Sequence, residues 1–296
     1  MMVTTLLMCM MMMLVCEAPR AGRSSETAQN PDFKERDEFN QSYRLAPGAR
    51  VEVSSIRGPV EIVTGENATA EVQIIRTART RADLEYHKIE VEQTGEGLVV
   101  RGVQEPEQRQ RQNIRVDHRV RLKLPRQIDL AVKSISGWIN VGDVDGETFV
   151  NSISGSANLG NVGGKLQVNS VSGNLKAGNV GAEARVNSIS GNLSLGQLNG
   201  SLEVTSVSGS LRVVLVSLSP QGIHIKSVSG SIEISFQGEI NADFNAESVS
   251  GQVHLNVPNV IRESEENSSH VRARIGAGGT PIKILSVSGN IRLKQG

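Results

Sequence analysis

The sequence predicts an all-β protein, a single-stranded parallel β-solenoid in which 18-residue coils, each made of paired nonapeptides, stack on one another. Three observations predict this fold. A Ser-Ile/Val-Ser-Gly tetrad recurs, aliphatic and polar residues alternate after it, and a glycine keeps a fixed place in each unit. The tetrads begin at Ser134, Ser152, Ser170, Ser188, Ser206, Ser227, Ser248 and Ser286.

The first four steps between tetrads are each 18 residues long, and each step divides into two nonapeptides, such as ISGNLSLGQ and LNGSLEVTS. Positions five and seven are usually aliphatic, as in Leu193 and Leu195. Side chains two apart on a strand share a side, so we expect these to face inward and the residues between them, such as Ser194 and Glu203, to face water. One strand and one turn cannot cover their own apolar side, so the units must stack.

Stacking places equivalent residues about 4.8 Å apart. We therefore expect an amide ladder of Asn151, Asn169 and Asn187. The glycines Gly142, Gly160, Gly178 and Gly196 form an edge without side chains. The tetrads are expected to form two surface columns of serine flanking an inward aliphatic column.

The regular β-solenoid is predicted over 134–296, with a loop insertion at 259–280. The steps from Ser206 to Ser227 and from Ser227 to Ser248 each carry three extra residues. The inward places are still occupied, by Ile223 and Ile225, by Phe244 and Ala246, and after the insertion by Ile282 and Ile284.

Residues 42–133 are predicted to be a more irregular N-terminal β region, continuous with the solenoid rather than a separate domain. Strands are expected to begin near Val51, Val60, Ala70, Ile89, Gly97 and Ile114. A short helix is expected over Ala82 to His87, and a loop over Glu105 to Gln112.

Residues 1–18 are predicted to be a signal peptide and 19–41 a flexible tether. The run VTTLLMCMMMMLV is too short to span a bilayer and fits a secretory h-region, although no Lys or Arg precedes Arg20. Cys16 is either lost with the signal or lipidated, and the bulk of Val15 argues against lipidation. Both cysteines, Cys9 and Cys16, lie in this stretch, so we expect no disulfide, thiolate metal site or cysteine nucleophile in the mature chain. We also expect no transmembrane segment in the mature chain.

The chain has 31 basic and 31 acidic residues, which excludes nucleic-acid binding by bulk charge. A local basic face is predicted after residue 114, where Arg115, Arg119, Arg121 and Lys123 alternate with apolar residues and Arg109 and Arg111 precede them. This face is either a solvated sheet surface or a contact for phosphate or sulfate groups of an envelope polymer.

The leucine-proline step Leu124-Pro125, the Ser-Val-Ser-Gly repeats and the glycine-rich segment from Gly276 to Gly279 resemble the bacterial putative-adhesin family, over roughly Arg44 to Gln295. The resemblance implies an exported domain of unknown function with a parallel β-solenoid fold. It brings no catalytic or ligand residues.

Candidate chemistry is sparse, and we assign no catalytic, cofactor-binding or metal-binding residue; the ligand-binding residues stay unknown. Asp143 and Asp145 share one turn, which is either a calcium site or simply a solvent-exposed turn. A zinc pair is conceivable among the scattered histidines, of which His118 is expected to be half-buried and His224 and His254 outward; the other two are His87 and His270. A glycan-cleaving enzyme needs two convergent carboxylates, and no matched pair stands out among Glu147, Glu183, Glu203, Glu233, Asp243 and Glu247.

The sequence therefore favours a non-catalytic, adhesin-like binding or structural module exported to the periplasm, cell envelope or cell surface. The expected partners are envelope or extracellular carbohydrate or another envelope protein, without a cofactor. The alternative is a polysaccharide-active enzyme, a lyase or hydrolase, on a β-helix scaffold. An envelope-sensing protein is a third possibility.

Overall fold

The computed structural model describes residues 33–95, 97–104, 116–267 and 269–296. The chain separates into two units, Met1–Pro31 and Asp32–Gly296, and all described residues lie in the second. The predicted signal peptide, Cys16, most of the predicted tether and the predicted loop at 105–112 lie outside the described residues. Within them, no helix has the length and apolar character needed to cross a membrane.

The described residues form one 23-stranded sheet and one short helix. The N-terminal elements are β1 (Glu35–Arg44), β2 (Ala49–Arg57), β3 (Val60–Gly65), β4 (Thr69–Ala78), α1 (Arg81–Tyr86), β5 (His87–Thr94), β6 (Gly97–Gln104) and β7 (Val116–Pro125). The repeat region begins with β8 (Ile128–Ser136), β9 (Ile139–Val141), β10 (Thr148–Ser154), β11 (Ala157–Leu159), β12 (Leu166–Ser172), β13 (Leu175–Ala177), β14 (Ala184–Ser190) and β15 (Leu193–Ser208). It ends with β16 (Leu211–Ser229), β17 (Ile232–Phe236), β18 (Ala242–Ser250), β19 (Val253–Asn256), β20 (Val260–Asn267), β21 (His270–Ile275), β22 (Thr280–Ser288) and β23 (Ile291–Gln295).

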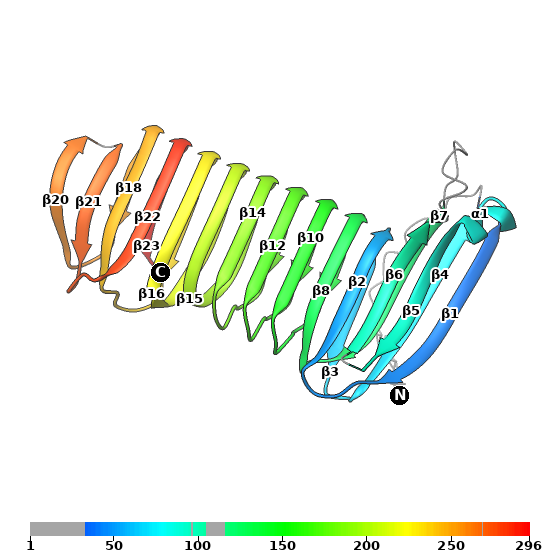
Figure 1. Ribbon diagram of the computed structural model, residues 1–296. Coiled ribbons are helices and arrows are strands. Elements are labelled where there is room, and N and C mark those ends of the chain that lie inside the picture. Colours follow the sequence, from blue (N-terminus) through cyan, green and yellow to red (C-terminus); the bar gives the residue numbers. More distant parts are fainter. Residues whose placement is uncertain (1–32, 96, 105–115, 268) are drawn as a thin grey trace, which may run out of the picture. The chain divides into compact units, whose positions relative to one another are not determined.

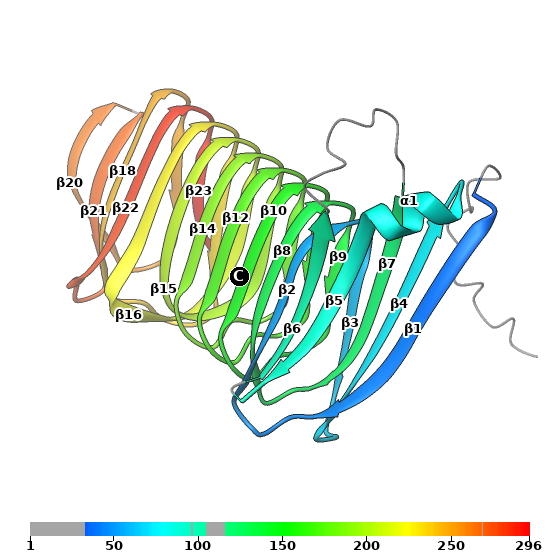
Figure 2. The same ribbon diagram turned by 45° about the vertical axis from the view of Figure 1, so that its right-hand side comes forward.

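The middle of the sheet follows the 18-residue repeat. Strands β8, β10, β12, β14 and β15 lie side by side and pair in parallel, each tetrad beside the next (Figure 1). The chain then bends round to a second row, in which β9, β11, β13 and the start of β15 also pair in parallel (Figure 2). Isolated bridges join Val144, Val162, Val180 and Leu198.

Alternation within each strand builds the interior, and the inward places are as predicted. Leu195 is 2% exposed and Leu202 is 1% exposed, whereas Glu203 between the strand's apolar residues is exposed. The three extra residues before Ser227 are absorbed by register shifts, so that Leu202 still pairs with Ile223 and Ser206 with Ser227. The core is almost wholly aliphatic: among the described residues its main cluster buries the aromatic side chains Phe236 and Phe244, and Tyr43 packs against it.

The predicted fold class is wrong, because the sheet is mixed and wraps nearly closed like a barrel instead of forming a purely parallel solenoid. Antiparallel pairs occur at the N-terminal end between β1 and β4, β4 and β7, and β5 and β6. They recur at the C-terminal end between β18 and β21 and between β20 and β21. Only β5 with β6 and β20 with β21 are hairpins of consecutive strands, which antiparallel pairing permits with a short connection. The other three pairs join strands that are separated by two or more elements in the chain.

The strands are also not stacked in the order of the sequence. β22 lies between β16 and β18, so the last tetrad occupies a place between two earlier ones. At the other end, β2 lies between β6 and β8, and β3 lies between β7 and β9. The N-terminal region and the repeats therefore share one sheet through backbone hydrogen bonds.

Two local expectations are revised, and a third, the short helix, is confirmed to within one residue at each end. Residues 35–41, predicted to be tether, are part of β1, which is held on β4 by pairing and by the ion pair between Asp37 and Arg76. The insertion at 259–280 is a β-hairpin of β20 and β21 rather than a loop. The predicted helix is present as α1, and Thr80 caps it: its hydroxyl accepts from the Asp83 N–H, and the Asp83 carboxylate accepts from the Thr80 N–H.

The tetrad glycines form a column that no other residue can replace without strain. Gly191 has a φ of +128°, and a Cβ added there would lie 2.0 Å from the carbonyl oxygen of Gly173. Gly173 stands in the same relation to Gly155, at 2.1 Å. The column therefore supplies both a left-handed backbone conformation and room for the neighbouring chain.

We expect Leu195→Ala to lower the free energy of unfolding by about 2–5 kcal/mol, because it opens a cavity in the closed interior. The adjacent Ser194→Ala should change it by less than about 0.5 kcal/mol, because that side chain is partly exposed. Urea denaturation measures both. Equal losses at the two sites would contradict the inward and outward assignment.

Gly191→Ala should destabilise the protein by about 1–3 kcal/mol, because the methyl group meets a backbone carbonyl and the residue must keep a positive φ. The control is Gly65→Ala, where an added Cβ meets nothing within 4 Å. Thermal unfolding of both variants provides the comparison. A similar midpoint for the two would show that the glycine column tolerates side chains.

Candidate functional site

The tetrads expose a file of aliphatic side chains, which we call the aliphatic ridge. Its members are between 45% and 74% exposed, and they are Ile153, Val171, Ile189, Val207, Val228, Val287 and Val249. The first serine of each tetrad points inward instead, and seven of the eight are buried: Ser134, Ser152, Ser188, Ser206, Ser227, Ser248 and Ser286. The prediction is therefore wrong for the first serines and for the aliphatic column, whereas the second serines, such as Ser154 and Ser172, are exposed as predicted.

The reason is the phase of the strand alternation. Val150 and Ser152 both face inward, so the period of two continues through the tetrad and turns Ile153 outward. The buried serine hydroxyls satisfy backbone groups where they can: Ser248 Oγ donates to the Gly289 carbonyl at 2.9 Å, and Ser134 Oγ to the Ser136 carbonyl at 3.2 Å. The sequence predicts this orientation when the inward and outward alternation is counted from the strand residues before the tetrad, rather than started afresh at its first serine.

A polar depression of about 830 Å³, here called the asparagine groove, lies across β3, β9, β11 and β13. Its polar lining residues are Glu61, Thr64, Arg126, Asn140, Asp143, Asn158 and Lys176. The amide of Asn158 donates to Asn140 Oδ1 at 3.0 Å, so the two amides are held in fixed orientations. Gly142 and Gly160, from the predicted edge without side chains, leave backbone open along the same groove.

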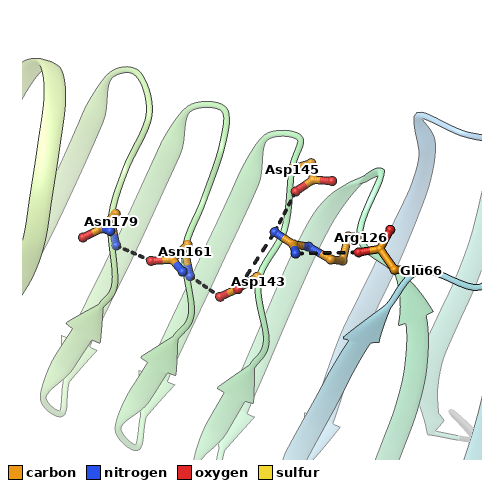
Figure 3. Close-up of polar contacts among 6 residues, drawn as sticks. All are labelled: Glu66, Arg126, Asp143, Asp145, Asn161 and Asn179. Carbon is orange, nitrogen blue, oxygen red and sulfur yellow. Dashed lines mark hydrogen bonds and ion pairs between the residues drawn. The ribbon is translucent and has the colours of Figure 1, made fainter.

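The two aspartates considered for calcium, Asp143 and Asp145, form ion pairs with Arg126 (Figure 3). Arg126 Nη2 lies 3.2 Å from Asp145 Oδ1 and 3.9 Å from Asp143 Oδ2, and its Nη1 lies 3.7 Å from Glu66 Oε1. A guanidinium therefore takes the place that a cation would need, and the calcium interpretation loses its support.

Asp143 also begins a ladder of side chains that accept from the backbone. Its Oδ1 accepts from the Asn161 N–H at 2.7 Å, and Asn161 Oδ1 accepts from the Asn179 N–H at 2.9 Å (Figure 3). Asn179 Oδ1 continues the ladder to the Gln197 N–H at 3.0 Å. The carboxylate is thus a structural cap for the first turn of the stack.

A second cleft, of about 590 Å³, brings together two of the carboxylates considered for catalysis, Glu183 and Glu203. Arg185 lies between them, with Nη2 3.1 Å from Glu183 and Nε 2.8 Å from Glu203. Lys165 adds a contact of 2.9 Å to Glu183. A glycosidase needs two carboxyl groups that face the scissile bond, and here both carboxylates are engaged in ion pairs.

The other candidate carboxylates do not join this cleft. Glu233 is paired with Lys294 at 2.6 Å and Arg212 at 3.2 Å, and hydrogen bonding from Lys294 is the main cause that lowers its pKa. Asp243 accepts from the Gly279 N–H at 3.1 Å. Glu147 and Glu247 line neither the cleft nor the asparagine groove.

The basic face predicted on β7 is largely neutralised by neighbouring strands. Arg121 Nε donates to Glu61 at 2.9 Å, and Lys123 Nζ donates to Glu71 at 2.7 Å. Arg109, Arg111 and Arg115 lie outside the described residues. What is described of this face thus resembles a solvated sheet surface more than a phosphate site.

The structure brings two histidines together, but inside the protein. His118 is 4% exposed, more buried than predicted, and its ring centroid lies 6.1 Å from that of His87. Neither His118 ring nitrogen has a hydrogen-bond partner among the described residues; the His87 backbone lies near the ring without hydrogen-bond geometry. His224 and His254 are exposed, as expected, and among the described residues no three metal-ligating side chains converge.

The pKa of His118 is lowered from 6.5 to about 4, mainly by burial and in smaller part by the charges of His87 and Arg76. Burial also lowers the pKa of His87. His118 is therefore protonated near pH 6.5 in the unfolded chain but only near pH 4 in the folded protein. The free energy of unfolding accordingly falls as the pH decreases from 6.5 to 4.

We expect the free energy of unfolding to fall by about 3 kcal/mol between pH 6.5 and 4 on account of His118, at roughly 1.4 kcal/mol per pH unit. His118→Leu should remove this part of the pH dependence, because no hydrogen bond to the ring is lost. His254→Leu, at an exposed site, is the control and should keep it. Urea unfolding at several pH values measures the slope; an unchanged slope in His118→Leu would refute the assignment.

Solved structures similar to this chain include two adhesin-like proteins and one other. A putative adhesin from Bacteroides fragilis is 14% identical, with a TM-score of 0.45 over 88% of this chain and 97% of that chain. A putative adhesin from Parabacteroides distasonis is 11% identical, with a TM-score of 0.38 over 88% and 97%. A putative lipid binding protein from Parabacteroides distasonis is 14% identical, with a TM-score of 0.29 over 87% and 96%. At these values the likenesses carry no information about the ligand of this chain.

None of the curated proteins matches the chain. A family match, in contrast, covers residues 49–294, from the first residue of β2 into β23. It includes the asparagine groove, the second cleft and the aliphatic ridge. By this match the chain belongs to the Toastrack DUF4097 family.

Proposed function

We propose that the protein is a non-catalytic binding module that holds an extended polar ligand in the asparagine groove. One observation carries the proposal: the groove offers amide, ammonium and carboxylate groups fixed on hydrogen-bonded strands, while its acidic groups are already engaged. Glu61 accepts from Arg121, and Asp143 accepts from the Asn161 N–H. Groups held in this way suit recognition better than proton transfer, which needs an acid or base free to change charge.

The chemistry of the groove suits a carbohydrate polymer. Asn140, Asn158 and Lys176 follow one another on adjacent parallel strands, so donors and acceptors recur about every 4.8 Å along the stack. Amide groups with both donor and acceptor atoms match sugar hydroxyls, which also donate and accept. Export to the cell envelope or surface, expected from the sequence, would bring the groove to such polymers; an envelope protein is the alternative partner.

The enzyme alternative is less well supported. Glu183 and Glu203 do converge in the second cleft, but Arg185 and Lys165 hold them as ion pairs. Both carboxylates are therefore already paired within the protein, whereas the acid and the nucleophile or base of a glycosidase must contact the substrate or its attacking water.

The test is a screen of the whole chain against immobilised glycans and envelope polymer fractions. Asn158→Ala and Lys176→Ala should each weaken binding to any polymer retained by about tenfold, the equivalent of one or two lost hydrogen bonds. Lys283→Ala removes the same charge from an exposed position on β22, outside the groove, and should leave binding unchanged. Retention that is equal in all variants would place the ligand elsewhere, and hydrolysis of a retained glycan would favour the enzyme.

A further inference from the structure

The aliphatic ridge is the most regular apolar feature on the described surface, and the proposed ligand groove does not use it. Its seven side chains come from seven strands that are paired in sequence across the sheet, in the order β10, β12, β14, β15, β16, β22 and β18. These strands lie side by side in Figure 1. Successive members are therefore about 4.8 Å apart, and the file is roughly 30 Å long.

A second column of side chains, here called the charged column, runs beside the ridge and carries opposite charges at its two ends. It consists of the residues just before the first serine of each tetrad. Lys133 on β8 stands at one end and Glu247 on β18 at the other, and both are exposed. Between them, in spatial order, lie Asn151, Asn169, Asn187, Thr205, Lys226 and Leu285.

We propose that the ridge is the contact surface for a second copy of this chain, packed antiparallel about a two-fold axis between β14 and β15. The axis falls there because β14 and β15 are the middle pair of the eight strands from β8 to β18. It sets Ile189 against Val207 of the second copy, and Val171 against its Val228. The interface is isologous, so every contact occurs twice.

Charge selects the antiparallel arrangement. Antiparallel packing places Lys133 of each copy beside Glu247 of the other, whereas a two-fold axis along the ridge would put the two columns on opposite sides of it and leave both charges without a partner in the second copy. Lys133 Nζ already contacts Glu52 at 2.9 Å within its own chain, and an ammonium group has further donors for a second carboxylate. Only the antiparallel form therefore pairs opposite charges between the copies.

Spacing and area favour a second copy over an unrelated partner. Two identical files have the same period, so the side chains of one can enter the gaps of the other along the whole contact. Each half-exposed Val or Ile has roughly 50 Å² of apolar surface left to bury, so two ridges bury about 700 Å². With the flanking serines and the charged column the total reaches about 1,000 Å², the lower limit for specific association, and predicts a weak, reversible dimer.

Sedimentation velocity of the whole chain over a concentration series tests the proposal. We expect a dimer with a dissociation constant in the micromolar range. Val207→Asp should weaken it at least tenfold, because each dimer would then bury two carboxylates. Val63→Asp is the matched control, since both valines are 47% exposed and Val63 lies on β3, off the ridge. Thermal unfolding confirms that each variant is folded.

Charge reversal tests the direction of packing. Lys133→Glu and Glu247→Lys should each weaken the dimer several-fold, and the double variant should restore it to within about threefold of the original. A monomer at all concentrations, or association that Val207→Asp leaves unchanged, would overturn the proposal. Restoration failing in the double variant while Val207→Asp still weakens the dimer would overturn the antiparallel arrangement. Glycan retention is tested at other residues, in the asparagine groove, so the result for the ligand proposal and the result for the dimer proposal are independent of each other.

Discussion

The parallel backbone ladder between residues 18 positions apart is the interaction on which the rest of the structure depends. It places Ser152 beside Ser170 and Val150 beside Val168, and so on through the middle strands. Once this spacing is set, each position of the repeat becomes a column, and its residue type decides what that column does. Inward aliphatic columns exclude water, glycine columns let neighbouring backbones approach, and amide columns link one turn to the next.

The same ladder explains why the acidic side chains on this surface are engaged in structural contacts. An acidic side chain in a column meets the backbone N–H or the cation of the adjacent turn, as Asp143 meets Asn161 and Glu203 meets Arg185. Such contacts fix the orientation of the acidic side chain. Neutral amides such as Asn140 and Asn158 keep donors and acceptors available, which is the property of a recognition surface.

Much of the repeat could be predicted from the sequence, because alternation is a local property. The inward places of Leu195, Leu202 and Ile223 are confirmed, and so is the outward place of Glu203. The strand order could not be predicted, because the insertion of β22 between β16 and β18 is a choice of neighbours that no local pattern records. The parallel solenoid was wrong for the same reason: chain reversal at both ends depends on contacts between distant segments. The site was missed in part because Arg126 lies outside the repeat, and only the fold brings it to Asp143 and Asp145.

The place of β22 and β23 has a consequence for how the protein is made. A nascent chain that has reached residue 279 can assemble β16 and β18 separately, but the slot between them stays vacant until 280–295 leave the ribosome. Until then β16 and β18 each present an unpaired edge, and Ile225 and Ala246 lack their shared neighbour Ile284. Residues 280–295 therefore join β16 to β18, and the interior between these two strands closes only after this segment has paired.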